Sequence, residues 1–280
     1  MTNLSSISSG LEPYSPSPSK PWNRRRVAHL LRRTRLGAPN RQEIDFFLGL
    51  SPSEAVDKLF EFRPVPSPPD WVNEPISVPP DKELERQRRK ELMKWWLSTA
   101  YSDKSVRERM VYFWSNHFVV EATKVKNPQM LYKINSLFRT FSVGNLKDLT
   151  KAVGKEPAML IYLDGIKSTK QNLNENYGRE LQELFTIGRG NYSQEDVREA
   201  ARAYTGWQID RKNLSGFLSP LRHDWGTKTF YGQNGPWNGD DIVDIIFQRD
   251  ETAIFIEKKY IDILSTTYRM KGLCRNWPSF

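Results

Sequence analysis

The stretch NENYGRELQELFTIG (174–188) carries the helical pattern that decides the fold. Apolar residues recur at spacings of three and four, the period of an α-helix, at Tyr177, Leu181 and Leu184. Polar residues keep the same spacing on a stripe about 100° round the helix, at Asn176, Glu180 and Glu183. The stretch therefore predicts an amphipathic helix whose polar edge borders its buried face.

Outward from this stretch, most of the chain has the same helical period. Apolar residues recur three and four apart in residues 51–60, 81–101, 105–120, 129–141, 145–153, 192–207, 240–248 and 251–259. Ser51 with Glu54, and Ser193 with Asp196, have the spacing of capping boxes, and Gly206 suits a helix exit. The sequence predicts an all-α single domain over residues 24–259.

Two stretches interrupt the helical pattern. Residues 63–80 contain seven prolines, which predicts a loop over the surface. Residues 206–241 form an insert rich in Gly, Asn and aromatic residues, with room for a short β-hairpin. Residues 1–23 are rich in Ser and Pro and are expected to be a disordered tail.

Composition limits the class of protein. With 280 residues, 38% of them hydrophobic, the chain can bury one sizeable core. It has no apolar run of roughly 18 residues that would span a bilayer. The tail has no apolar stretch typical of a secretory signal, so the sequence as written indicates a cytoplasmic protein. A lone cysteine, Cys274, excludes an internal disulfide and a multi-cysteine metal site.

The net charge of +9 is concentrated near the N-terminus. Residues 1–41 hold eight Lys and Arg against one acid, Glu12, so this segment carries +7 and the remainder only +2. Most of these cations belong to one expected helix, residues 21–37. A protein that grips nucleic acid with its body should have a basic face there, so we expect a solvated basic helix surface and no nucleic-acid partner.

The polar stripe is the first candidate site. No Gly-rich phosphate loop, nucleophile elbow or His-Glu-x-x-His pair occurs in the sequence. Glu180 and Glu183 lie one turn apart, so mutual repulsion and partial burial would raise the pKa of one carboxyl and make it a general acid. The structural alternative is an ion-pair cluster, in which Arg179, Arg198 and Arg202 supply the cations.

Histidines provide the second set of candidates. His117 shares a helical stripe with apolar Val106, Met110 and Phe113, where a lone histidine is more often a hydrogen-bonded core residue than a ligand. His223 and Asp224 lie in the insert, where loops often carry function. If His117, His223, Glu180 and Glu183 meet in space, imidazole and carboxylate together would suit zinc, iron or manganese. The sequence does not fix which metal, if any, is bound.

Several of these stretches together resemble a bacterial family, domain of unknown function 1800. The matching runs are MVYFWSNHF (110–118), EPAMLIYLDG (156–165), NENYGRELQELFTIG (174–188) and YSQEDVREAARAYTGW (192–207). HDWGTKTFYG (223–232) and residues 239–259 follow in the family's order, and AHLLRRTRLGAP (28–39) resembles its first helix. The resemblance covers about residues 24–259.

The resemblance implies a partner more than an activity. Members of the family tend to be encoded beside a sulfatase-like family, domain of unknown function 1501, whose members look exported. It therefore implies an association with the cell envelope, in which a helical protein assists or modifies an exported partner. Some relatives have a histidine in place of Ser115 or Phe185, and its absence here makes a histidine-based metal site less favoured.

The C-terminal residues depart from the family pattern. Relatives are longer and continue with a helix of the type KIYRYF, whereas residues 260–280 have no clear apolar period. The codons AAA AAA ATA TAT AGA TAT TTT encode KKIYRYF, and loss of one A gives the KKYIDI found at 258–263. We therefore expect residues 260–280 to be an out-of-frame tail on a truncated member.

The sequence leaves three functions open. The leading interpretation is a helical accessory protein that binds an exported sulfatase-like partner and whose polar stripe is structural. The first alternative is a hydrolase with Glu180, Glu183 and His117 as catalytic residues and Asn176, His223 and Asp224 as ligand-binding residues. The second alternative is a non-functional product of a truncated gene.

Overall fold

The protein is mostly α-helical, in agreement with the sequence-based prediction. The computed structural model describes residues 13–76 and 79–265. The α-helices are α1 (Arg24–Thr34), α2 (Arg41–Leu48), α3 (Pro52–Leu59), α4 (Lys82–Ser102), α5 (Arg107–His117), α6 (Pro128–Thr140), α7 (Leu146–Val153), α8 (Pro157–Tyr162), α9 (Asn176–Glu180), α10 (Gln194–Ala203), α11 (Gly239–Ile246) and α12 (Asp250–Ser265). Shorter elements are the 3₁₀ turns η2 (Asp70–Asn73) and η3 (Gly165–Lys167), and the π-helix η4 (Leu181–Thr186).

The helix starts follow the capping chemistry of the sequence. The Ser51 and Ser193 hydroxyl oxygens accept hydrogen bonds from the backbone nitrogens of Glu54 and Asp196. The carboxylates of Glu54 and Asp196 in turn accept from the backbone nitrogens of the two serines. Both predicted capping boxes are confirmed. Gly206 has φ +85°, and a Cβ at this position would lie 2.8 Å from the backbone nitrogen of His223. A glycine is therefore needed where the chain leaves α10 and enters the insert, close to the backbone of His223.

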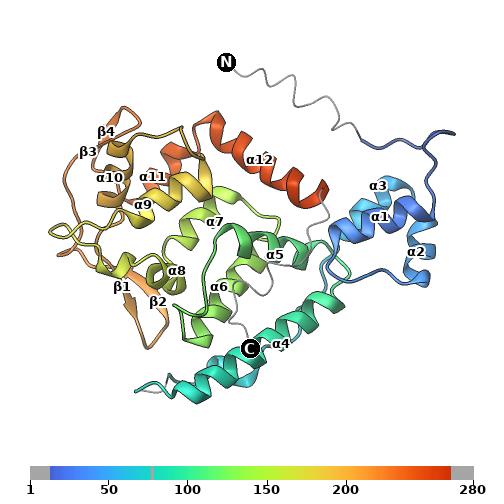
Figure 1. Cartoon of the computed structure of the whole chain (residues 1–280), viewed down its shortest axis with the longest axis horizontal. Coiled ribbons are helices and arrows are strands. Elements are labelled where there is room, and N and C mark those ends of the chain that lie inside the picture. Colours follow the sequence, from blue (N-terminus) through green and yellow to red (C-terminus); the bar gives the residue numbers. More distant parts are fainter. Residues whose placement is uncertain (1–12, 77–78, 266–280) are drawn as a thin grey trace.

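Buried apolar side chains form two clusters. The larger one fills the body built from α4–α12 and includes Trp114, Phe118 and Leu181. The smaller one joins α1, α2 and α3 through Val27, Leu31, Phe47, Ala55 and Leu59. We call residues 24–59 the α1–α3 module. Figure 1 shows this module at one end of the molecule, with α4 running from it along the edge of the body.

The insert contains two short antiparallel hairpins. The first pairs β1 (Trp207–Asp210) with β2 (Ser215–Leu218), and the second pairs β3 (Lys228–Phe230) with β4 (Gln233–Gly235). Trp207 lies opposite Leu218, and Lys228 lies opposite Gly235. Both hairpins lie at the end of the body opposite the α1–α3 module (Figure 1). The sequence predicted room for one hairpin, and the structure has two.

Residues 63–76 of the proline-rich stretch contain one short element, the 3₁₀ turn η2, and they are anchored to the body. Trp71 is buried, and its indole nitrogen donates to Glu91 of α4 at 2.8 Å. The side-chain amide of Gln129 donates to the carbonyl oxygens of Trp71, Val72 and Glu74 at 3.2, 3.1 and 2.6 Å. The bonds to Val72 and Glu74 give backbone oxygens of the loop a hydrogen-bond partner, and the Trp71 oxygen also accepts from the backbone nitrogen of Glu74 at 3.1 Å. The loop is therefore docked against α4 and α6.

Both termini extend partly beyond the described residues. The predicted disordered tail over 1–23 lies outside them as far as residue 12, while Tyr14 donates to the carbonyl oxygen of Lys20 at 2.6 Å. At the other end, α12 continues six residues past Lys259. Tyr260 stacks on Phe113 with ring centroids 4.6 Å apart, and Ile263 is buried. Helical packing therefore extends beyond the predicted boundary at 259, while the reading frame itself stays a prediction.

No helix among residues 13–76 and 79–265 combines the length and apolar character needed to cross a bilayer.

Candidate functional site

The polar stripe of residues 174–188 lies on a helix that changes type halfway. Gly178 allows α9 to approach α10 closely, because a Cβ there would lie 2.8 Å from the backbone of both Val197 and Ala201. From Leu181 onward the helix widens to the π form, and the Thr186 hydroxyl donates to the carbonyl oxygen of Leu181 at 2.6 Å. π-Helical turns are rare and occur often at functional sites.

The end of the π-helix leaves carbonyl oxygens that distant side chains satisfy. His117 Nε2 lies 2.9 Å from the carbonyl oxygen of Phe185, and Lys259 Nζ donates to that of Leu184 at 2.8 Å. Lys259 Nζ also lies 3.2 Å from His117 Nδ1. The imidazole is therefore neutral, donating from Nε2 and accepting at Nδ1. The backbone nitrogens of Ile187 and Gly188 cap the helix locally at the carbonyl oxygen of Gln182, and α5 and α12 supply the further partners.

Burial changes the protonation of both capping groups. His117 is 4% exposed, and burial, with the nearby Lys259 charge, lowers its pKa to about 3. Burial also lowers the pKa of Lys259 to about 8. Because both ring nitrogens of His117 have partners, the geometry assigns it a structural contact. The prediction that it takes part in catalysis stays untested.

Neutral His117 makes the protein sensitive to mild acid. The folded state holds this pKa at about 3, against 6.5 for the free side chain, so between these values only the unfolded state binds a proton. The contribution of neutral His117 to the free energy of unfolding is complete well above pH 6.5. It falls as the pH is lowered, and at about pH 5 it is smaller by about 2 kcal/mol. In urea unfolding at about pH 7 and about pH 5, wild type should lose about 2 kcal/mol more than His117→Gln. Equal losses would contradict the assignment.

The two glutamates of the stripe have different environments. Glu183 accepts from the Tyr192 hydroxyl at 2.6 Å and pairs with Arg189 at 2.5 Å, and these contacts lower its pKa. Glu180 is half-buried and makes no hydrogen bond or ion pair with the described residues. Burial, with the nearby Glu183 charge, raises its pKa. The raised pKa distinguishes Glu180 from Glu183, and the predicted catalytic role of both glutamates stays a prediction.

Asn176 lies at the exposed start of the same helix. Its backbone nitrogen donates to the Asn174 side chain at 3.0 Å, and its amide lies 3.4 Å from the carbonyl oxygen of Leu163. These contacts tie α9 to the end of α8. Its predicted ligand-binding role stays a prediction.

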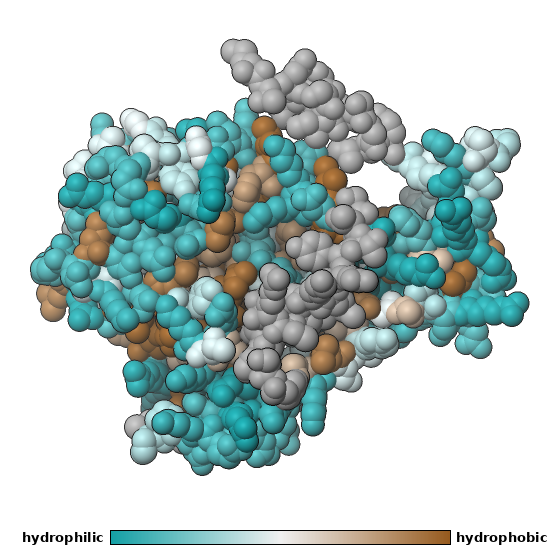
Figure 2. Space-filling model, in the orientation of Figure 1, coloured by the Kyte–Doolittle hydropathy of each residue, from teal (hydrophilic) through white to brown (hydrophobic). Residues whose placement is uncertain are grey.

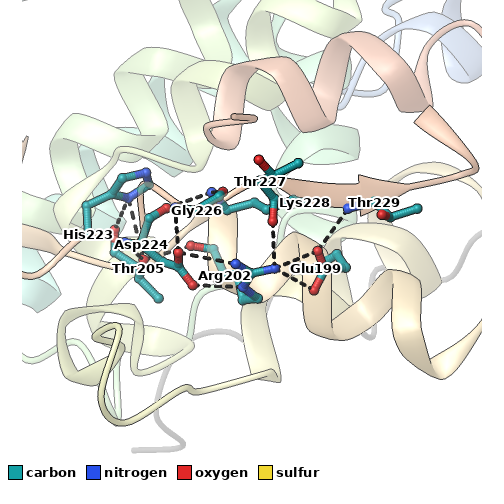
Figure 3. Close-up of polar contacts among 9 residues, drawn as sticks. All are labelled: Glu199, Arg202, Thr205, His223, Asp224, Gly226, Thr227, Lys228 and Thr229. Carbon is teal, nitrogen blue, oxygen red and sulfur yellow. Dashed lines mark hydrogen bonds and ion pairs between the residues drawn. The ribbon is translucent and has the colours of Figure 1, made fainter. Parts of the chain in front are cut away.

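His223 and Asp224 belong to a separate network, centred on Arg202 of α10 (Figure 3). Arg202 donates to Asp224 from Nε at 2.7 Å and to both oxygens of Glu199 at 2.9 and 2.8 Å. It also donates to the carbonyl oxygen of Thr227 at 3.1 Å. The hydrogen bonds to Asp224 and Glu199 raise the pKa of the guanidinium. We call this group, Glu199, Arg202 and Asp224, the insert clasp.

The insert clasp fixes the backbone of the loop around it. Glu199 accepts from the backbone nitrogen of Thr229 at 3.0 Å, and Asp224 accepts from that of Gly226 at 2.8 Å. Lys228 is 1% exposed and donates to the carbonyl oxygens of Asp224 and Gly226 at 2.6 and 3.0 Å. The loop between the two hairpins is therefore held to α10 mainly by charged hydrogen bonds.

His223 lies at the edge of the clasp. Its Nδ1 donates to the carbonyl oxygen of Thr205 at 2.8 Å, and the residue is 1% exposed. Nε2 is buried and has no hydrogen-bond partner. Burial lowers the pKa of this imidazole, so the ring is neutral with Nδ1 protonated. The Trp225 ring packs against it edge-on at 4.5 Å.

The candidate residues therefore form two groups. His117 contacts the helix that carries Glu180 and Glu183, whereas His223 and Asp224 contact α10 and the insert. Within residues 13–76 and 79–265, no three His, Cys, Asp or Glu side chains gather as a metal-binding set. The four candidate metal ligands, His117, His223, Glu180 and Glu183, therefore do not form a single metal-binding group. Arg202 pairs with Glu199 and Asp224, so the expectation that it pairs with Glu180 or Glu183 was wrong.

Sequence reasoning missed the partners that determine both groups. Lys259 lies in a helical stretch with no special motif, and only its contact with η4 reveals its role. Glu199 and Arg202 have the i,i+3 spacing of an ion pair, which was a usable signal. Nothing in the sequence pairs them with Asp224, because that contact spans 22 positions.

An apolar groove lies where the α1–α3 module meets the body. It has a volume of about 320 Å³ and is lined by Leu30 and Val56 on the module, by Phe60 directly after it, and by Met110, Val143 and Tyr260 on the body. Val56, Val143 and Phe60 remain 42%, 47% and 51% exposed. On the face shown in Figure 2 most of the surface is hydrophilic, and separate hydrophobic patches include one on the module at the right. Exposed apolar side chains gathered in a groove are typical of a binding surface.

The protein is mostly helical. Its polar stripe lies on the helix of residues 174–188, and its apolar groove lies between the α1–α3 module and the body. The chain belongs to the family described as "Protein of unknown function (DUF1800)", whose sequence profile matches residues 29–269. This membership confirms the resemblance found in the sequence. No curated protein and no solved structure matches the chain.

Proposed function

We propose that this protein is a helical accessory protein that binds an acidic amphipathic segment of a partner protein in the apolar groove. The observation that carries the proposal is the groove itself, where Val56, Phe60 and Val143 remain exposed although apolar. Burial of such apolar surface contributes about 25 cal/mol of favourable free energy for each Å², and this would drive association. An amphipathic helix that lays its apolar face in a groove is a recurring mode of recognition.

Charges beside the groove indicate the sign of the partner. Arg33 lies one helical turn from Leu30 on α1, and Arg109 precedes Met110 on α5. Burial lowers the pKa of Arg109 and the charge of Arg33 lowers it further, so the two cations are close enough to repel. The Arg109 guanidinium donates to the carbonyl oxygen of Ile263 at 3.1 Å, while its Nε is buried without a partner. An acidic side chain on the bound segment would relieve this repulsion.

The family resemblance supplies a specific partner for this role. Relatives tend to be encoded beside a sulfatase-like family, domain of unknown function 1501, whose members look exported. We propose that a member of that family supplies the acidic segment. The structural contacts of His117, Glu183 and Asp224 fit an accessory role, because each joins two elements of the fold. This proposal places the protein with the cell envelope, through its partner.

Phe60→Glu should abolish the complex with the sulfatase-like partner. The change puts an anion into the apolar groove, where it would repel an acidic segment, and removes an aromatic ring, which should weaken binding by about 100-fold or more. Phe217→Glu is the matched control, because Phe217 is 48% exposed on β2, away from the groove. Size-exclusion chromatography of the co-expressed proteins measures the outcome. Equal binding by both variants would contradict the proposal.

The hydrolase alternative retains one observation in its favour. Glu180 is half-buried and unpaired among the described residues, and burial, with the nearby Glu183 charge, raises its pKa. The same experiment separates the two functions. Retention of the complex by Phe60→Glu, together with a hydrolytic activity that Glu180→Gln removes without loss of folding, would favour the enzyme.

A further inference from the structure

A second hollow lies at the seam between the α1–α3 module and the body, and it differs in character from the groove. It has a volume of about 510 Å³, within the roughly 300–1,000 Å³ of small-molecule sites. Phe46 and Phe47 of α2 line one side, and Lys104 and Ser105 before α5 line the other. We call it the basic pocket.

The charges of the basic pocket do not balance. Its lining includes four cations and three carboxylates, namely Arg35, Lys58, Arg63 and Lys104 with Glu43, Glu61 and Asp103. Asp103 forms an ion pair with Arg107 at 3.0 Å, and Arg107 does not line the pocket. Its other oxygen accepts from the backbone and hydroxyl of Ser105 at 2.6 Å. The remaining lining therefore has an excess of positive charge.

The carboxylate of Glu43 is ionised and accepts three hydrogen bonds. It accepts from Lys104 at 2.6 Å, from Arg35 at 3.0 Å and from the backbone of Asn40 at 3.0 Å. Burial would raise its pKa, but these bonds outweigh burial and lower it to about 2. One carboxylate is thus shared by two cations, which leaves part of their charge available to another anion.

Two arginines have donors to spare. Arg35 is 2% exposed, and its Nε and Nη1 are buried with no hydrogen-bond partner among the described residues. A buried guanidinium with unused donors costs free energy that a bound anion can recover. Within the described part of the chain, the exposed Arg63 side chain makes no hydrogen bond or ion pair. The planar fork of an arginine matches a carboxylate or a phosphate.

The pocket also offers an aromatic surface. Phe46 is 54% exposed, and its ring packs edge-on against Phe47 at 5.5 Å. A large exposed aromatic beside arginines suits a ligand with an apolar ring and a negative group. We propose that the basic pocket binds a small organic anion, with its carboxylate or phosphate near Arg35 and Arg63 and its ring against Phe46.

Phenyl phosphate tests the proposal by isothermal titration calorimetry on the whole chain. We expect saturable binding at millimolar concentration, weaker binding of inorganic phosphate, and no binding of neutral benzyl alcohol. Phenylacetate titrated in parallel tells whether the pocket prefers a carboxylate to a phosphate. Arg63→Gln and Phe46→Ala should each weaken the binding of phenyl phosphate by about 3–10-fold.

Matched controls use exposed residues outside the pocket. Arg25→Gln on α1 and Phe217→Ala on β2 remove the same side-chain types and should leave the affinity unchanged. Because Arg63 and Phe46 are exposed, neither test variant should impair folding, and thermal unfolding of each verifies this. Absence of saturable binding, or equal loss in the controls, would overturn the proposal. The result is independent of the apolar groove, so either proposal can fail alone.

Discussion

Arg139→Met is expected to lower the free energy of unfolding by about 3–5 kcal/mol. Arg139 of α6 and Glu108 of α5 form a bidentate pair with distances of 2.6 and 2.9 Å, and both side chains are almost fully buried. The Trp96 indole of α4 donates to the same carboxylate at 3.1 Å. Loss of the guanidinium leaves the buried Glu108 carboxylate with the Trp96 indole and, 3.8 Å away, Arg107 Nε, and a charge in the core that has lost its bidentate partner is costly. Urea unfolding at neutral pH measures the change.

A double variant distinguishes loss of the pair from loss of packing. Glu108→Gln/Arg139→Met replaces the charge with a neutral amide that still accepts from Trp96, so it should be more stable than Arg139→Met alone. If the single variant stays within about 1 kcal/mol of wild type, the pair does not hold the three helices together as described.

Arg202→Met should cost about 2–4 kcal/mol and loosen the insert selectively. Removal of the guanidinium leaves Glu199, 5% exposed, and Asp224 without their shared cation. Since these carboxylates hold the backbone of Gly226 and Thr229, hydrogen exchange should accelerate over residues 223–231 more than in α5 or α6.

Arg198→Met on the same helix is the control for the insert clasp. Arg198 is exposed, and its replacement should change stability by no more than about 0.5 kcal/mol. If the two variants accelerate exchange in the insert equally, the clasp does not anchor the loop.

The sequence was most informative where the determinants are local. The caps at Ser51 and Ser193 were predictable, because a side-chain oxygen and a carboxylate three residues later satisfy the first backbone nitrogens of a helix. Glu175 and Arg179 have the i,i+4 spacing that favours an ion pair on a helix, and the pair is present at 3.2 Å. The prolines of residues 63–80 argued against a long helix or strand, and residues 63–76 contain only the short turn η2.

Prediction failed where the determinants are distant in the chain. The π-helix at Leu181–Thr186 replaces the regular α-helix that the 3.6-residue period indicated, and its last carbonyl oxygens depend on His117 and Lys259. The His117–Lys259 contact spans 142 positions, so no local pattern encodes it. His117 on one helical stripe and Glu180 with Glu183 on another were candidates for chemistry, whereas the structure gives His117 and Glu183 contacts within the fold.

Val56 is the position from which the central claim can be tested most directly. A photo-crosslinking amino acid placed there lies in the apolar groove, and the same amino acid at Phe217 lies on β2, away from it. With the sulfatase-like partner co-expressed, mass spectrometry identifies the crosslinked peptide. The account predicts a crosslink from position 56 alone, to an acidic amphipathic segment of the partner. Absence of that crosslink, or an equal yield from position 217, would contradict it.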